Sequence, residues 1–508
     1  MTYPLRIDYI YALMLIFYSI VFFLALLLLI RFSGLNKRIG FHPWVLPIFF
    51  AIKCVIGLLF LELYIFDQPD AQANNDAGTF LFEGEILHDV FHDSPSAYFH
   101  FLTGIGESQE LIEEYLMETD HWSTGDQDIV NDNKNIIRIH SLLYFISFGS
   151  SVIHMMIFCL LSLLGSTFLF IAIKSYSQLK PSIILSLLVF LPSVLFWSSG
   201  LVKESVVILG LGFFAFGLIS TSTWRKRILI GIIGTFILLL FKPYILLILL
   251  PCLLVCLVYL KIKKYSLMAI LILIPVCITG FVIIAPSTLQ EATHFLSRKQ
   301  HDFSNVGRGG MHVQADTCFY YFSPDKYAQL ELNGDTVSLT NEIDAWIVRH
   351  GSLRPPEPVH LFPTDEVWIM TFENEPAYSF IEISPIDDSP LQLLINSPSA
   401  LANALFRPLP IDAGSALKYP AFIETILIFG LIIWSLIRRR KLSKKEKGII
   451  LTMILFSLAL ALLIGWVTPV LGAIARYRIP IQLAMVIIGA ILISPPERFR
   501  SKSENDDI

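Results

Sequence analysis

The chain has 508 residues, of which 55% are hydrophobic and only 16% are charged, with a mean hydropathy of +0.65. A soluble domain carries about 25% charged and 45–50% apolar residues, so this apolar excess cannot be buried in one water-soluble core. With 37 Lys and Arg against 42 Asp and Glu, the chain lacks the basic excess of a nucleic-acid-binding protein. The composition predicts a membrane protein that contacts lipid and binds no nucleic acid.

Apolar runs in the sequence approach or exceed the roughly 20 residues that an α-helix needs to cross a bilayer. They predict an all-α polytopic transmembrane helix bundle of about eleven spans. The predicted spans are 10–31, 44–66, 152–173, 182–199, 204–221, 228–241, 244–260, 266–286, 421–437, 448–466 and 479–494.

The connections between these spans indicate an orientation. The basic connections are 31–43, 222–227, 261–265 and 438–447. All four fall on one side of the membrane if eleven helices alternate, and an excess of Lys and Arg marks the cytoplasmic side. We therefore expect a multi-pass protein of the bacterial inner membrane, with a periplasmic N-terminus and a cytoplasmic C-terminus.

This arrangement divides the chain into five segments. Two N-terminal spans (1–66) precede an outer acidic loop with surface helices (67–151), which leads to the central spans (152–286). An exported β-rich segment (287–420) and three C-terminal spans with a cytoplasmic tail (421–508) follow. Residues 67–138 contain sixteen Asp or Glu, and their only Lys or Arg residues are Lys134 and Arg138. Short apolar clusters in this loop predict amphipathic helices that lie on the bilayer surface and roof a cavity.

The exported segment contains two predicted β-hairpins. Residues 327–332 and 336–339 alternate between apolar and polar side chains around Asn333-Gly334, which favours a two-residue turn. Residues 367–372 and 378–383 form the second predicted pair. Together these hairpins predict a small β-rich module over 312–385. It is either a lid, a ligand-binding module or a docking site for an envelope protein partner, or else a solvated structural insertion.

Several charged residues lie within the predicted spans or at their outer ends, where a charge is energetically costly. Lys and Arg at the outer ends are also unexpected, because an excess of these residues marks the cytoplasmic side. The charged residues in question are Lys53, Lys203, Glu204, Lys242, Arg407, Glu424, Arg476 and Arg478. Converging cations would bind a phosphate or pyrophosphate, because Arg offers a planar fork of donors and Lys a point charge. Alternatively, each cation reaches lipid headgroups or pairs with an acidic residue of a loop.

Asp76 is the candidate catalytic residue. It lies in a predicted turn shortly after the second span, where a carboxylate could act as general base on an acceptor hydroxyl or hold a divalent metal beside a phosphate. Asp89 and Asp93, four residues apart on one helical face, are the second choice. His140 and His154 fit core positions better than ligand positions. No Cys/His spacing resembles a zinc site, and no Walker loop occurs.

Residues 192–204, Pro-Ser-Val-Leu-Phe-Trp-Ser-Ser-Gly-Leu-Val-Lys-Glu, resemble a segment of a widespread group of uncharacterised bacterial polytopic membrane proteins. Phe241-Lys242-Pro243-Tyr244, Leu405-Phe406-Arg407-Pro408 and residues 476–480 fit the same group. The architecture is also distantly similar to GT-C-type glycosyltransferases and polysaccharide polymerases, which have an acidic residue in a first outer loop and a basic outer cavity. Here the long acidic loop follows the second span instead of the first and contains no Asp-x-Asp pair. Either an N-terminal helix has been added or the likeness is superficial.

The resemblance implies a membrane glycosyltransferase or glycan polymerase of GT-C type. It would use a polyprenyl-phosphate-linked sugar on the outer face of the inner membrane, with Asp76 as catalytic base. Substrate would be bound by Lys53, Lys203, Glu204, Lys242, Arg407, Arg476 and Arg478. The alternatives are a non-catalytic lipid or glycan transporter, with the cations along its substrate path, and an envelope scaffold that acts through 312–385. The polyprenyl-phosphate lipid or glycan would be the main partner.

Overall fold

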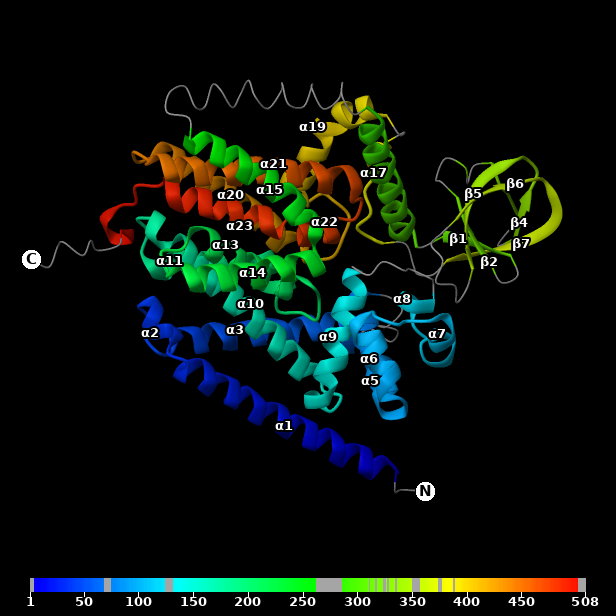
Figure 1. Ribbon diagram of the computed structural model, residues 1–508, viewed down its shortest axis with the longest axis horizontal. Coiled ribbons are helices and arrows are strands. Elements are labelled where there is room, and N and C mark those ends of the chain that lie inside the picture. Colours follow the sequence, from blue (N-terminus) through cyan, green and yellow to red (C-terminus); the bar gives the residue numbers. More distant parts are fainter. Residues whose placement is uncertain are drawn as a thin grey trace, which may run out of the picture.

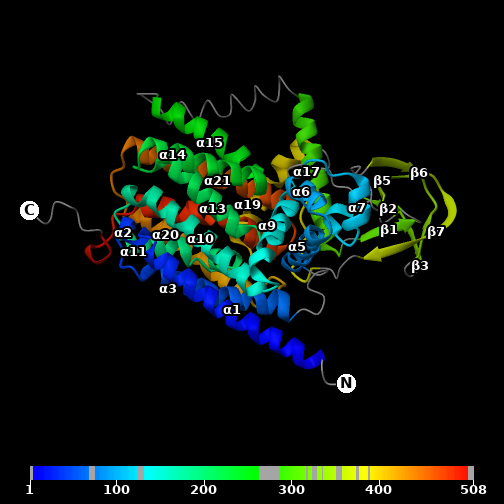
Figure 2. The same cartoon turned by 60° about the horizontal axis from the view of Figure 1, so that its bottom comes forward.

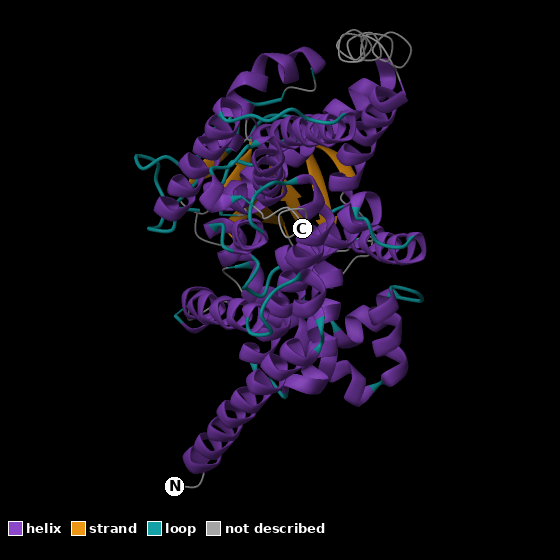
Figure 3. Ribbon diagram, turned by 90° about the vertical axis from the view of Figure 1, so that its left-hand side faces the viewer, coloured by secondary structure: helices purple, strands orange, loops and turns teal. Residues whose placement is uncertain are grey.

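The structure is a computed structural model. It describes residues 4–67, 75–123, 131–261, 286–309, 311–315, 318–322, 326, 329–333, 336–349, 357–372, 377–386 and 389–500. Most of the described chain is helical, and one antiparallel sheet lies at one end of the molecule (Figure 1; Figure 3 shows the same division by colour).

Six helices of the described chain are long and apolar enough to cross a membrane. They are α1 (Pro4–Phe32), α3 (Val45–Leu61, continued by the π-helix η1, Glu62–Phe66), α10 (Ser151–Ile173), α15 (Pro243–Lys261), α20 (Lys418–Ile437) and α21 (Lys444–Val467). The helices α22 (Leu471–Tyr477) and α23 (Ile479–Leu492) meet at Arg478 with a bend of 47°. Counted as one bent span, this pair is the seventh. The protein is thus a helical membrane protein.

The predicted count of about eleven spans is not confirmed. The run 182–199 is broken into α11 (Pro181–Val189) and α12 (Pro192–Trp197), and α13 (Glu204–Ile219) is shorter than a full crossing. The helix α14 (Trp224–Phe241) begins with three consecutive basic residues, which shortens its apolar part. The predicted span 266–286 lies almost entirely outside the described residues.

The helices of the bundle run alongside one another (Figure 1), and many of their apolar side chains are exposed. Phe17 on α1, Leu229 on α14, Leu254 on α15 and Leu427 on α20 are each more than 60% exposed. Such a belt has no favourable contact with water, so lipid must cover it. The buried charged residues therefore lie inside the bundle or at its ends, away from this apolar surface.

The basic connections gather at one end of the bundle. Arg440 donates to the carbonyls of Tyr176 (2.7 Å) and Ile491 (3.0 Å) and pairs with Glu446 (2.6 Å), and Lys444 donates to the carbonyl of Leu260 (2.9 Å). In Figure 1 this end is on the left, whereas α1 begins on the right, on the side of the acidic loop and the sheet.

The acidic loop folds into a helical layer at the opposite end (Figure 2). Its helices are α5 (Asp76–Asp93), α6 (Pro95–Thr103), α7 (Gln109–Tyr115), α8 (Asp120–Ser123) and α9 (Asp132–Ser147). The predicted helices are present, but their apolar side chains pack on one another, because Phe80, Leu87, Tyr98, Phe101 and Trp122 are all buried. The layer is a cap whose core continues into the bundle, since the same cluster of buried side chains includes Phe158 of α10 and Leu460 of α21.

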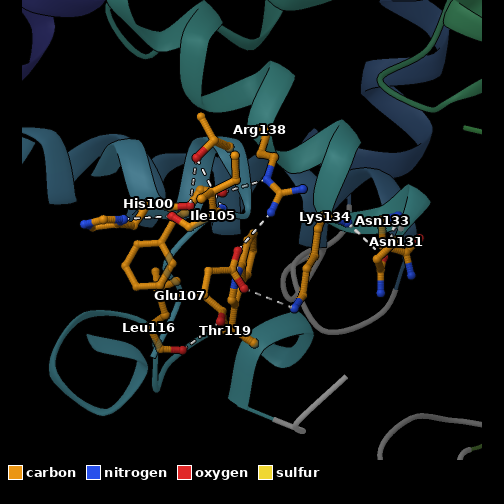
Figure 4. A network of polar contacts seen from close by, with 12 residues as sticks. His100, Ile105, Glu107, Leu116, Thr119, Asn131, Asn133, Lys134 and Arg138 are labelled. Atoms are coloured by element: carbon orange, nitrogen blue, oxygen red, sulfur yellow. Dashed lines mark hydrogen bonds and ion pairs between the residues drawn. The ribbon is translucent and has the colours of Figure 1, made fainter. Parts of the chain in front are cut away.

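Glu107 is the centre of the polar network that holds this cap together. It accepts from Arg138 Nη2 at 2.9 Å and lies 3.9 Å from Lys134 Nζ, and both side chains extend from α9 toward it (Figure 4). Arg138 Nε also donates to the carbonyl of Phe101 (2.7 Å). These contacts fix α9, and with it the position of Asp132 at its first turn.

The segment 287–420 contains a seven-stranded antiparallel sheet of order β3-β4-β7-β1-β2-β5-β6. The strands are β1 (Met311–Ala315), β2 (Cys318–Tyr321), β3 (Glu331–Asn333), β4 (Thr336–Leu339), β5 (Ile343–Arg349), β6 (Glu357–Leu361) and β7 (Thr364–Phe372). The first predicted hairpin is confirmed in part as β3–β4: its second strand is present as predicted, but of 327–332 only Glu331 and Leu332 are in β3, and 327–328 lie outside the described residues. The second is wrong: β7 pairs with β1 and β4, and residue Phe380 forms an isolated bridge with Val470 instead.

Two helices that the sequence did not predict flank this sheet. The helix α17 (Pro286–Gly307) precedes it, and α19 (Pro390–Phe406) follows it and packs against α21. The β-rich part is therefore confined to 311–372, and α19 belongs to the membrane bundle.

Close approach of α10 and α13 depends on glycine. A Cβ atom at Gly212 would lie 2.0 Å from the carbonyl oxygen of Gly165. We expect Gly212→Val to destabilise the protein by about 1–3 kcal/mol through overpacking and to lower the thermal unfolding temperature in detergent. Gly430→Val on α20, where a Cβ meets no atom within 4 Å, is the control. Equal unfolding temperatures for the two variants would contradict this packing.

Candidate functional site

Asp76 is the first residue of α5, at the end of the bundle that the cap covers. Asn75 caps this helix by accepting from the Gly78 N–H at 3.0 Å, and its amide donates to the Tyr64 carbonyl at 2.9 Å. These bonds tie the start of the cap to the end of the second span. They hold the Asp76 carboxylate 2.7 Å from Nη1 of Arg476, which comes from α22.

Glu204 is the second carboxylate of the cluster. It is the first residue of α13, only 4% exposed, and lies 3.2 Å from Arg476 Nε and 3.8 Å from Lys242 Nζ. Neither of its oxygens has a hydrogen-bond partner among the described residues. An ion-paired carboxylate without hydrogen bonds retains acceptor capacity toward water or a ligand.

Asp132 and Lys203 complete the cluster. Lys203 Nζ lies 2.6 Å from Asp132 Oδ2 and also donates to the side chain of Asn133. It stands 5.4 Å from the ring centre of Phe80 on α5. Lys203 therefore connects the loop before α13 to both long helices of the cap.

Aromatic rings surround the cations. Lys242 Nζ lies 4.2 Å from the ring centre of Tyr477 and 5.6 Å from that of Tyr244. Arg476 Cζ lies 5.8 Å from the ring centre of Trp197. A small pocket opens between these groups. Its walls include Glu204, Lys242, Tyr244, Arg476, Tyr477 and Pro480.

The electrostatics favour ionised carboxylates. Burial raises the pKa of Asp76, but the charges of Arg476 and Lys203 outweigh it, so the pKa of Asp76 is lowered to about 2. For Asp132, burial also raises the pKa, and Lys203 and Lys242 reverse the effect, so the net pKa is lowered. Asp76 keeps 52% of its side chain exposed, so a ligand can reach it.

The cluster is built like an anion-binding site in which carboxylates of the protein itself take the place of a bound anion. Asp76, Asp132 and Glu204 each lie in the first turn of a helix, where the backbone carries a partial positive charge. Three helix N-termini therefore meet three cations. A negatively charged ligand can bind here by displacing the accessible carboxylate of Asp76 from Arg476.

The structure separates the other predicted site residues from this cluster. Lys53 is buried within α3 and donates to the Ser198 hydroxyl at 2.8 Å, below the cluster. Arg407 pairs with Asp412 at 3.4 Å. Arg478 is 2% exposed and donates to the carbonyls of Arg407 and Ala421. Only Lys203, Glu204, Lys242 and Arg476 lie with Asp76.

Sequence reasoning missed Asp132 and the aromatic walls. Asn131-Asp132-Asn133 was a recognisable helix start, since Asn131 caps α9, but it stood among many acidic residues. The second-choice carboxylates Asp89 and Asp93 are exposed on the outer face of the cap.

Two further sequence-based expectations concern metals and histidines. No group of three or more His, Cys, Asp or Glu side chains suited to a metal ion occurs among the described residues. His140 and His154 are buried core residues whose Nδ1 atoms lie 2.9 Å apart.

Comparison with protein-family models, with curated proteins and with solved structures found no match for this chain.

The depressed pKa of Asp76 predicts an acid-dependent loss of stability. A carboxylate with a folded pKa of about 2 and an unfolded pKa of 3.8 stabilises the folded state above pH 4 and loses this contribution as the pH falls toward 2. We expect the unfolding temperatures of wild type and Asp76→Asn to differ by a constant amount above about pH 5 and to converge in acid. A difference that stays constant into strong acid would contradict the ion pair.

Proposed function

We propose that this protein is a membrane glycosyltransferase or glycan polymerase of GT-C type that uses a polyprenyl-phosphate-linked sugar. One observation supports this proposal most: the accessible Asp76 carboxylate contacts Arg476 at the end of the bundle, beside Lys203 and Lys242 and under the helical cap. A lipid-linked phosphate would reach these cations at the end of the apolar helices.

The cations would bind the phosphate of the donor. Arg476 offers a planar set of donors and Lys242 and Lys203 offer point charges, so together they would neutralise the charge that develops as the sugar–phosphate bond breaks. The walls of Tyr244, Tyr477 and Trp197 around these cations limit water, which strengthens the interactions.

Asp76 would act as the general base. With a pKa of about 2 it is a weak base while it is paired with Arg476. A donor phosphate that engages Arg476 would release Asp76, whose pKa would then rise. Asp76 would remove the proton of the acceptor hydroxyl, the oxygen would bond to the anomeric carbon, and the phosphate would leave with the electron pair. Donor binding would therefore precede acceptor activation.

A lipid or glycan transporter is the second candidate, because the break between α22 and α23 lies at Arg478, next to the charge cluster. Transporters build substrate sites at discontinuous helices. A scaffold that acts through the sheet is the third, and it requires the strands of 311–372 but not the cations.

The proposed orientation follows from the two ends of the bundle. The basic connections at one end would face the cytoplasm, and the cap and sheet at the other would face the periplasm of a bacterial inner membrane.

Asp76→Asn should reduce sugar transfer at least a hundredfold, because the amide cannot accept the acceptor proton. The assay would follow labelled sugar from the lipid-extractable pool into product in membrane vesicles that contain the full chain. Asp89→Asn, which removes an exposed carboxylate from the same helix, should keep full activity.

The outcomes also distinguish the rival functions. Full transfer by Asp76→Asn would refute its role as base. Labelled lipid that crosses the membrane without covalent transfer would favour a transporter. Loss of function on replacement of 311–372 by a short linker, with Lys203→Gln and Lys242→Gln both active, would favour a scaffold.

A further inference from the structure

A second pocket lies on the other side of the broken helix from the charge cluster. It is bounded by α19, α20 and α23, and its walls include Ala404, Leu405, Phe429, Arg478, Ile481 and Gln482. Arg476 contributes to the first pocket and Arg478 to the second, so the two cations serve different surfaces.

Arg478 retains unused binding capacity in this pocket. It is 2% exposed, its terminal nitrogens donate to the carbonyls of Arg407 and Ala421, and its Nε has no hydrogen-bond partner among the described residues. No carboxylate of the described chain forms an ion pair with it. The charge of Glu424 acts on Arg478 from beyond ion-pair distance, and the direct contacts of the guanidinium are with neutral groups, so an anion that joined it would stabilise it further.

The nearest acid is already engaged elsewhere. Glu424 accepts from the Ser193 N–H at 3.2 Å, from the Ser193 hydroxyl, and from Gln482 Nε2 at 3.0 Å. The oxygen of the Gln482 amide has no partner among the described residues. Two residues of the pocket wall thus each carry a buried polar atom without a hydrogen-bond partner among the described residues, a donor on Arg478 and an acceptor on Gln482.

The pocket also borders the lipid-facing surface. Phe406 at the end of α19 is 48% exposed, and Ile423 and Leu427 on α20 are 54% and 62% exposed. Arg478 lies at the break just before α23 begins, and it contacts Arg407, which ends α19. The ligand that satisfies these features is an amphiphile with an anionic head and apolar chains.

We propose that this pocket binds the phosphate headgroup of an anionic membrane lipid. A phosphate oxygen accepts from Arg478 Nε, a hydroxyl of the headgroup donates to the Gln482 oxygen, and the chains lie along the exposed faces of α19 and α20. This site does not depend on the glycosyltransferase proposal, because it shares no side chain with the Asp76 cluster.

Lipid binding by the purified full chain tests the proposal. Phosphatidylglycerol would be titrated into detergent-solubilised protein, with phosphatidylcholine as the zwitterionic reference, and bound lipid would be counted by native mass spectrometry. Leu405→Trp fills the pocket and keeps Arg478. Arg478→Gln removes the cation. Arg438→Gln removes an exposed arginine at the opposite end of α20 and is the matched control for charge.

We expect wild type and Arg438→Gln to retain phosphatidylglycerol over phosphatidylcholine, and Leu405→Trp and Arg478→Gln to bind it at least tenfold more weakly. If Arg478→Gln does not fold, Leu405→Trp decides. Unchanged affinity in Leu405→Trp overturns the proposal, as does equal retention of the two lipids by wild type. A parallel titration with a polyprenyl phosphate identifies the source: preference for it assigns the pocket to an isoprenoid lipid, and preference for phosphatidylglycerol assigns it to bulk lipid.

Discussion

Pairing of buried charge at the end of the helix bundle is the constraint on which the rest of the structure depends. Three cations lie there, and each pairs with a carboxylate from a distant part of the chain: Asp76 with Arg476, Asp132 with Lys203, and Glu204 with Lys242. A cation or carboxylate left alone at this depth would be costly. The pairs of Asp76 and Asp132 therefore hold the cap on the bundle, and Asp76, whose side chain is 52% exposed against 38% for Asp132, is where a ligand can intervene.

Much of the fold follows from local sequence signals. Long apolar runs such as 10–31 and 448–466 became α1 and α21 because a bilayer demands about 20 consecutive apolar residues. The runs between 182 and 241 did not become full spans, since Pro192 and the basic residues at the start of α14 interrupt them. The sheet order could not be predicted, because β7 pairs with β1 across more than forty residues of chain.

The site was only partly predictable for a different reason. Cations at the predicted outer ends of spans led to Lys203, Lys242 and Arg476, and the structure places these three side chains in one cluster with Asp76. The same signal included Arg407 and Arg478, because sequence cannot show on which side of a helix a side chain lies. Arg476 and Arg478, two residues apart beside the break between α22 and α23, line different pockets, and only the three-dimensional arrangement reveals this.

A double-mutant cycle on Asp76→Asn and Arg476→Gln tests the central contact most directly, with the free energy of unfolding as the measured quantity. The account predicts that the double variant loses less stability than the sum of the two single variants, by about 0.5 kcal/mol or more, as residues in direct contact do. Additive losses, within about 0.3 kcal/mol, would show that the two side chains do not interact and would contradict the account.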